Sequence, residues 1–101
     1  MGKKFKAKVF LTEYGIFDAL ESGKVDIALL DSYQQPTDAH FCFVYLTLRT
    51  AEGISSALDR AVPGGVMELY FDMVKLVLRE KRSEGVIELL RTEFEIELIT
   101  A

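Results

Sequence analysis

Strand-like patterns at both ends of the chain, with helical and strand patterns between them, predict an α+β fold. Polar and apolar residues alternate over Lys4 to Leu11 and again over Glu93 to Ile99, which is the pattern of half-buried strands. Apolar residues three to four positions apart over 13–22 instead indicate a helix. The 101 residues are 50% hydrophobic and 28% charged, and this length and composition predict a single domain over residues 1–101.

After the first strand we expect one helix and two further strands. Glu13 to Ser22 forms the helix, and Gly23 ends it, because glycine readily adopts the left-handed conformation that follows many helices. Val25 to Asp31 alternates as a strand, and Ser32 to Ala39 is a polar loop. His40 to Arg49 is apolar on both faces and is therefore predicted to be a central strand.

The second half of the chain is predicted to be mainly helical before the last strand. Thr50 caps a helix that runs to Ala61, and Pro63-Gly64-Gly65 ends it. Val66 to Arg82 is interpreted as a long, mostly buried helix, because its polar residues form one stripe at helical spacing. The residues of this stripe are Glu68, Asp72, Lys75 and Arg79. Val86 to Arg91 is either a short helix or a strand paired with the last strand.

This order of elements is that of a ferredoxin-like βαββαβ sandwich with a four-stranded, mostly antiparallel sheet and an enlarged second helical segment. Pairing of Val86 to Arg91 with the last strand would instead give five strands. Connection rules place the last strand beside the first and antiparallel to it. The lysines of the first strand and the glutamates of the last are complementary across such a pair. The expected pairs are Lys4 with Glu97, Lys6 with Glu95 and Lys8 with Glu93.

Charge and hydropathy exclude several classes of protein. The chain has 12 Lys and Arg against 16 Asp and Glu, and the net charge of −4 argues against direct nucleic-acid binding. The longest apolar run, Phe41 to Leu48, is too short to span a bilayer, so no membrane association is expected. The single cysteine, Cys42, cannot form an internal disulfide, and the cytoplasm is the expected compartment.

An aromatic stripe on the third strand is the main candidate site. Phe41, Phe43 and Tyr45 alternate with residues expected to pack on the helices, so they lie on the opposite face of the sheet. Aromatic residues are enriched at the centres of protein interfaces, and we expect this stripe to bind a protein partner or a second copy of the chain as a homodimer. Coverage of this face by other elements is the alternative. The expected rim is acidic and consists of Asp26, Asp31 and Asp38.

The sequence therefore predicts a non-enzymatic, acidic protein-interaction module. A sharper hypothesis is an inhibitor whose acidic surface occupies a basic or nucleic-acid-binding surface of its partner. The alternative is a small-ligand or nucleotide-binding regulatory domain that presents loop backbone to a phosphate. Its candidate residues are Thr12, Glu13, Gly15, Gly64 and Gly65. A small enzyme that uses a carboxylate is the third interpretation.

No catalytic residue, metal ligand or cofactor is predicted. His40 and Cys42 are the only residues of their types, whereas a zinc site needs three or four suitable ligands. Ser55 follows Gly53, but Ala57 replaces the second glycine of a nucleophile elbow.

Overall fold

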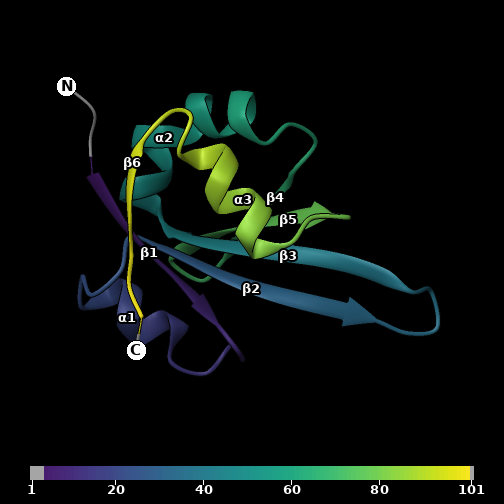
Figure 1. Cartoon of the computed structure of the whole chain (residues 1–101). Coiled ribbons are helices and arrows are strands. Elements are labelled where there is room, and N and C mark those ends of the chain that lie inside the picture. The colour runs from purple at the N-terminus through teal and green to yellow at the C-terminus, as the bar shows by residue number, and fades with distance from the viewer. Residues whose placement is uncertain (1–3, 101) are drawn as a thin grey trace.

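The computed structural model describes residues 4–100, which form a six-stranded mixed sheet with helices on both faces (Figure 1). The order of strands across the sheet is β4-β5-β3-β2-β1-β6. The predicted α+β class is confirmed, but the four-stranded, mostly antiparallel ferredoxin-like sheet is wrong. The elements are β1 (Lys4–Phe10), α1 (Ile16–Glu21), β2 (Ile27–Gln34), β3 (Ala39–Thr47), α2 (Leu48–Ala61), β4 (Val66–Tyr70), β5 (Met73–Arg79), α3 (Ser83–Leu90) and β6 (Glu95–Leu98).

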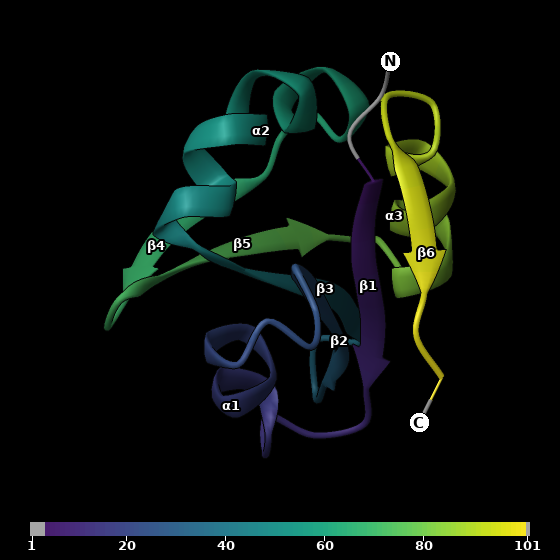
Figure 2. The same cartoon turned by 90° about the vertical axis from the view of Figure 1, so that its left-hand side faces the viewer.

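Helices lie on both faces of the sheet (Figure 2), and each face has its own hydrophobic core. On the face that we call the helical face, α2 and α3 cover the sheet, and Cys42, Val44 and Leu46 of β3 are completely buried there. On the opposite face, which we call the open face, α1 packs against Tyr45 and other residues. The prediction that alternate residues of the third strand pack on the helices is therefore confirmed, as is the internal position of that strand.

The predicted helix over Val66 to Arg82 is wrong, because this segment forms the β4–β5 hairpin and the connection to α3. The strands pair antiparallel, with Glu68 opposite Lys75 and Tyr70 opposite Met73. The turn between them contains Phe71 with a left-handed φ of 57°. Glycine and asparagine usually occupy such positions, so the sequence carries no ordinary turn signal here.

The last strand lies beside the first, as predicted, but the predicted direction is wrong because β6 runs parallel to β1. The hairpin adds two strands and α3 then crosses the helical face, so the chain returns to the edge in the same direction as β1. Lys4 is thus opposite Glu95, although its Nζ reaches Glu97 Oε1 at 3.4 Å. The helical interpretation of Val86 to Arg91 is confirmed except at its last residue, which is the C-cap.

The first half of the chain follows the prediction with shifted boundaries. Helix α1 is shorter than expected, and β2 extends to Gln34 through residues expected to be loop. Helix α2 begins at Leu48, and its cap is Thr47, whose hydroxyl accepts a hydrogen bond from the Thr50 backbone N–H at 3.2 Å. The expected cap, Thr50, therefore lies inside the helix.

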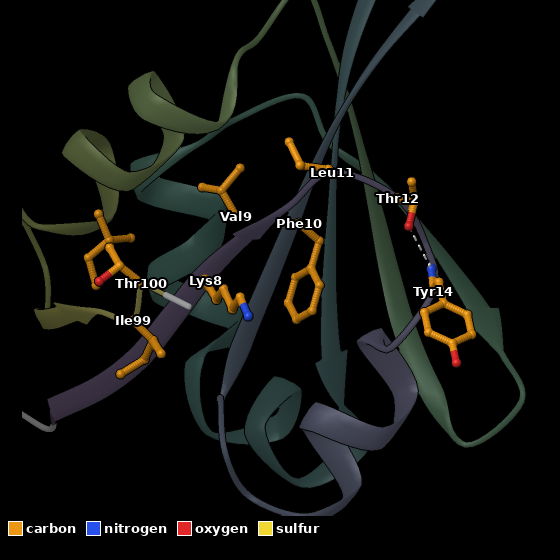
Figure 3. A pocket seen from close by; sticks show the side chains of 9 residues that line it. Lys8, Val9, Phe10, Leu11, Thr12, Tyr14, Ile99 and Thr100 are labelled. Atoms are coloured by element: carbon orange, nitrogen blue, oxygen red, sulfur yellow. Dashed lines mark hydrogen bonds between the residues drawn. The ribbon is translucent and has the colours of Figure 1, made fainter.

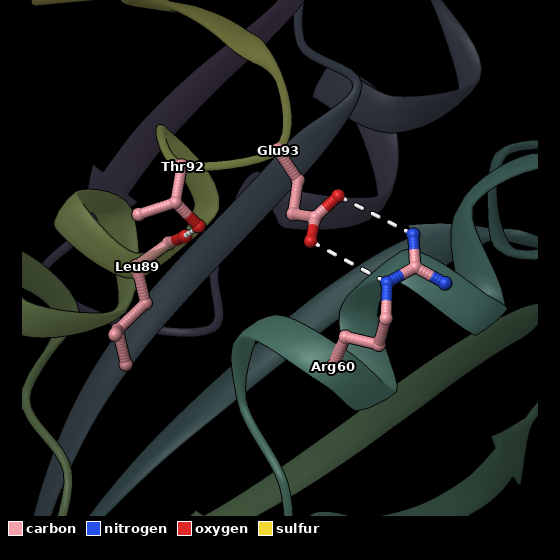
Figure 4. Close-up of polar contacts among 4 residues, drawn as sticks. All are labelled: Arg60, Leu89, Thr92 and Glu93. Carbon is pink, nitrogen blue, oxygen red and sulfur yellow. Dashed lines mark hydrogen bonds and ion pairs between the residues drawn. The ribbon is translucent and has the colours of Figure 1, made fainter.

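Contacts between α2 and the turn after α3 fix the approach to β6 (Figure 4). Arg60 Nε and Nη2 donate hydrogen bonds to the two carboxylate oxygens of Glu93 at 3.4 and 3.3 Å. The Thr92 hydroxyl donates to the Leu89 carbonyl at 2.6 Å and so caps the end of α3. These contacts join the helical layer to the β6 edge of the sheet.

Candidate functional site

A continuous row of apolar side chains crosses five strands on the open face. Phe10 lies beside Leu30, and Leu30 lies beside Phe43. Phe43 lies beside Val77, which lies beside Val66 of β4. We call these five residues the apolar row. Each of them keeps contact with solvent, and Val66 is 62% exposed.

The apolar row is open because α1 is too small to cover this face. At about 1.5 Å per residue, a helix of the length of α1 extends about 9 Å. Six strands spaced about 4.8 Å apart span roughly 24 Å. Helix α1 packs next to the row, and its core consists of Ile16, Ala19, Leu20, Val25, Ala28, Tyr45 and Met73. The apolar row therefore lies at the margin of this second core rather than within it.

Aromatic rings and cations occupy the middle of the open face. Phe41 stacks on Phe43 with ring centroids 6.2 Å apart and an interplanar angle of 16°. Lys75 Nζ lies 4.3 Å from the Phe43 centroid, and Lys8 Nζ lies 5.0 Å from the Phe10 centroid. Cations at this distance from an aromatic face are attracted by its negative potential. Lys8 and Lys75 thus lie over the aromatic rings of the apolar row.

Of the three predicted aromatic residues, Tyr45 is completely buried, whereas Phe41 and Phe43 are half-buried. The Tyr45 hydroxyl donates to Glu13 Oε2 at 2.8 Å, and the Tyr70 hydroxyl donates to Glu13 Oε1 at 3.3 Å. Burial, and then the hydrogen bond to Glu13, raises the pKa of the Tyr45 phenol above its ordinary value. Tyr45 consequently anchors the loop before α1 and is not accessible to a partner.

The three predicted rim acids lie apart and make internal contacts. Asp26 Oδ2 accepts from the Lys6 backbone N–H at 2.9 Å, beside the join of β1 and β2. Asp31 Oδ1 accepts from the backbone N–H and the hydroxyl of Ser83 at 2.7 and 3.0 Å, so it caps the start of α3. Asp38 lies in the β2–β3 turn and accepts a hydrogen bond from the Tyr33 hydroxyl. The structure therefore brings none of these acids together around the aromatic residues.

The residues of the alternative ligand site lie on opposite faces of the sheet. Thr12 and Gly15 belong to the loop before α1, where the Thr12 hydroxyl accepts from the Tyr14 backbone N–H at 3.3 Å. Glu13 of the same loop is bonded to the tyrosines described above. Gly64 and Gly65 connect α2 to β4, and Gly65 packs against leucines of the helical-face core. These two loops do not form one site.

A hollow of about 420 Å³ lies at the end of β1 (Figure 3). Its lining combines residues of β1, the following loop, the end of β6 and the chain after it: Lys8, Val9, Phe10, Leu11, Thr12, Tyr14, Leu98, Ile99 and Thr100. Leu11 and Tyr14 are 95% and 91% exposed, which leaves the hollow wide open to solvent. A smaller hollow of about 220 Å³ is lined by Asp31, Ser32, Tyr33, His40, Phe41, Lys81 and Arg82.

Within residues 4–100, Cys42 and His40 make separate contacts inside the fold. Burial raises the pKa of the Cys42 thiol to about 11, and its Sγ lies 3.6 Å from the Ser83 hydroxyl inside the core. His40 packs on the Tyr33 ring, with centroids 4.7 Å apart. Among residues 4–100, no group of three or more His, Cys, Asp or Glu is arranged to hold a metal ion.

Of the five members of the apolar row, sequence reasoning identified only Phe43, together with Phe41 beside it. Val66 and Val77 were assigned to a helix, so their alignment with the third strand was not expected. The alternation of β5, from Met73 to Arg79, was the signal that could have found them.

Comparisons of this chain with protein-family models, with curated proteins and with solved structures found no match. No helix within residues 4–100 has the length and apolar character needed to cross a membrane. The arrangement of the open face is therefore the basis for a functional proposal.

Proposed function

We propose that the protein is a non-enzymatic interaction module that binds another protein through the apolar row of the open face. The observation that carries this proposal is the alignment of five apolar residues, all in contact with solvent, across neighbouring strands. Contiguous apolar surface of this kind typically marks a protein-binding site. The stacked pair of Phe41 and Phe43 lies in the middle of the surface, where aromatic residues contribute most to binding.

The partner proposed here contributes a helix with an apolar stripe. Among residues 4–100, two helices cover the helical face, whereas α1 is the only helix on the open face. A helix about 10 Å wide fits beside α1 over the apolar row and completes the second layer of the domain. Lys8, Lys75 and Arg79 lie beside the row, and the nearby acids Glu68, Glu13 and Glu80 have partners within the fold. Acidic flanks on the partner helix therefore suit the lysines that lie over the aromatic rings.

This proposal keeps the interaction module predicted from the sequence and changes its partner. An inhibitor of a basic surface would use Asp26, Asp31 and Asp38, which are engaged within the fold. The phosphate-binding alternative would use two glycine-containing loops that lie on different faces.

The experiment uses a phage-displayed set of amphipathic helical peptides as the probe. Phe41→Glu and Val77→Glu should each weaken the selected peptides by about 30-fold, equivalent to ~2 kcal/mol at an interface centre. Leu48→Glu is the control, because Leu48 is a 44% exposed apolar residue on α2 at the other face. Circular dichroism checks that each variant is folded. Peptides whose binding survives both substitutions, or is weakened equally by Leu48→Glu, would contradict the proposal.

A further inference from the structure

Strand β4 is an unprotected edge of the sheet with apolar side chains on both faces. Val66 and Tyr70 lie on the open face, and Met67 and Leu69 lie on the helical face. Within residues 4–100 no strand pairs with its outer side, and Leu69 is 78% exposed. A strand that is apolar on both faces has the pattern of an interior strand. The sequence of β4 therefore suits a sheet that continues beyond it.

The backbone of β4 is able to accept another strand. In an antiparallel pair, the N–H and C=O groups of alternate residues point away from the partner. Those of β4 that do not bond to β5 face outward along the edge. Such a row of free groups is a template for pairing with an additional strand.

We propose that two copies of this chain form a closed dimer by antiparallel pairing of their β4 strands about a two-fold axis at Glu68. In this register Val66 lies opposite Tyr70 of the second copy, and Met67 lies opposite Leu69. Each apolar residue thus meets an apolar residue on both faces of the joined sheet. The two Glu68 side chains meet at the axis, where each has Lys75 beside it on β5.

A second copy is the occupant that this edge fits because the edge is complementary to itself. Pairing of β4 with β6 of another copy would instead bring apolar residues against Glu95 and Glu97, which are exposed on that edge. That head-to-tail contact would also leave a free edge at each end and generate open chains. The charges on β6 disfavour this head-to-tail pairing. The two-fold contact between β4 strands is then favoured, and it forms a closed dimer.

The first test measures the molar mass of the full chain by light scattering over a range of concentrations. We expect a dimer for the unmodified protein and about tenfold or greater weakening by Leu69→Lys, which places a charge on each paired edge. Leu11→Lys is the matched control, because Leu11 is 95% exposed at the end of β1, three strands away from β5. It should leave the dimer intact.

The second test examines the register with single cysteines under mild oxidation. Residues directly opposite in an antiparallel pair have Cα atoms about 4.5–5.5 Å apart, within the range of a disulfide. Glu68→Cys should therefore cross-link to itself across the axis, whereas Glu95→Cys on β6 should not. Native Cys42 is buried and does not interfere.

Three results would overturn the dimer. They are a monomer at every concentration, a dimer that Leu69→Lys leaves unchanged, and cross-linking at position 95 rather than 68. A dimer that Phe41→Glu dissociates and Leu69→Lys does not would assign self-association to the apolar row instead.

Discussion

The two edge strands of the sheet present opposite chemistry to solvent. On β6, two of four residues are glutamates, and Glu95 and Glu97 are both exposed. On β4, four of five residues are apolar or aromatic, and Glu68 is the only charged one. Proteins commonly protect sheet edges with charged residues, because uncharged edges pair with other chains. The difference indicates that β6 is built to remain an edge and β4 to be covered.

Removing the charges of β6 should produce the largest effect, because it makes both edges of the sheet able to pair. The variant Glu95→Val with Glu97→Val should form assemblies much larger than a dimer, because each copy then has two edge strands that can pair with other copies. Light scattering at increasing concentration measures this growth. Adding Leu69→Lys to the same variant is the control, because it closes one edge and should restrict the assembly to pairs. A variant that keeps the size of the unmodified protein would show that the β6 charges do not protect that edge.

The segments that lead into the two edges should respond oppositely to the same substitution. Gly64, before β4, has a φ of 88°, so Gly64→Ala should lower the free energy of unfolding by about 1–2 kcal/mol. Gly85 lies in α3, which leads to β6, and an added Cβ there meets no atom within 4 Å. Gly85→Ala should therefore raise the free energy of unfolding by roughly 0.5 kcal/mol. Urea denaturation measures both, and equal signs would contradict the backbone argument.

The regions predicted correctly are those in which local pattern and final environment agree. The alternation of Lys4 to Phe10 and the double apolar character of the third strand report directly how many faces of each strand are buried. The apolar spacing within Val86 to Arg91 allowed a helix as one of two alternatives, and α3 confirms that alternative. The position of these strands within the sheet could be inferred because each buried face of a strand consists mainly of apolar residues.

The β4–β5 hairpin could not be predicted in the same way, because its turn shifts the alternation of residues between the two faces of the sheet. Glu68 and Lys75 lie seven residues apart, yet they are opposite each other on one face, because the turn at Phe71 and Asp72 intervenes. Without a glycine or asparagine to mark that turn, the same spacing describes one face of a helix. The free edge and two of the five members of the apolar row, Val66 and Val77, were missed together for this reason.

The ion pair between the β6 edge and β1 tests whether the glutamates stabilise the fold or only discourage pairing. Lys4 Nζ lies 3.4 Å from Glu97 Oε1, and both side chains are about half exposed. An exposed pair of this kind contributes about 0–1 kcal/mol and is screened by salt. Glu97→Gln should therefore lower the free energy of unfolding by less than about 1 kcal/mol in low salt, and the difference should shrink in high salt. Urea denaturation at the two ionic strengths measures the free energy of unfolding. A larger loss that does not depend on salt would mean that Glu97 stabilises the fold by more than an exposed ion pair. Because glutamine remains polar, the variant should also keep the size of the unmodified protein, which separates this small effect from the assembly expected when both glutamates become valine.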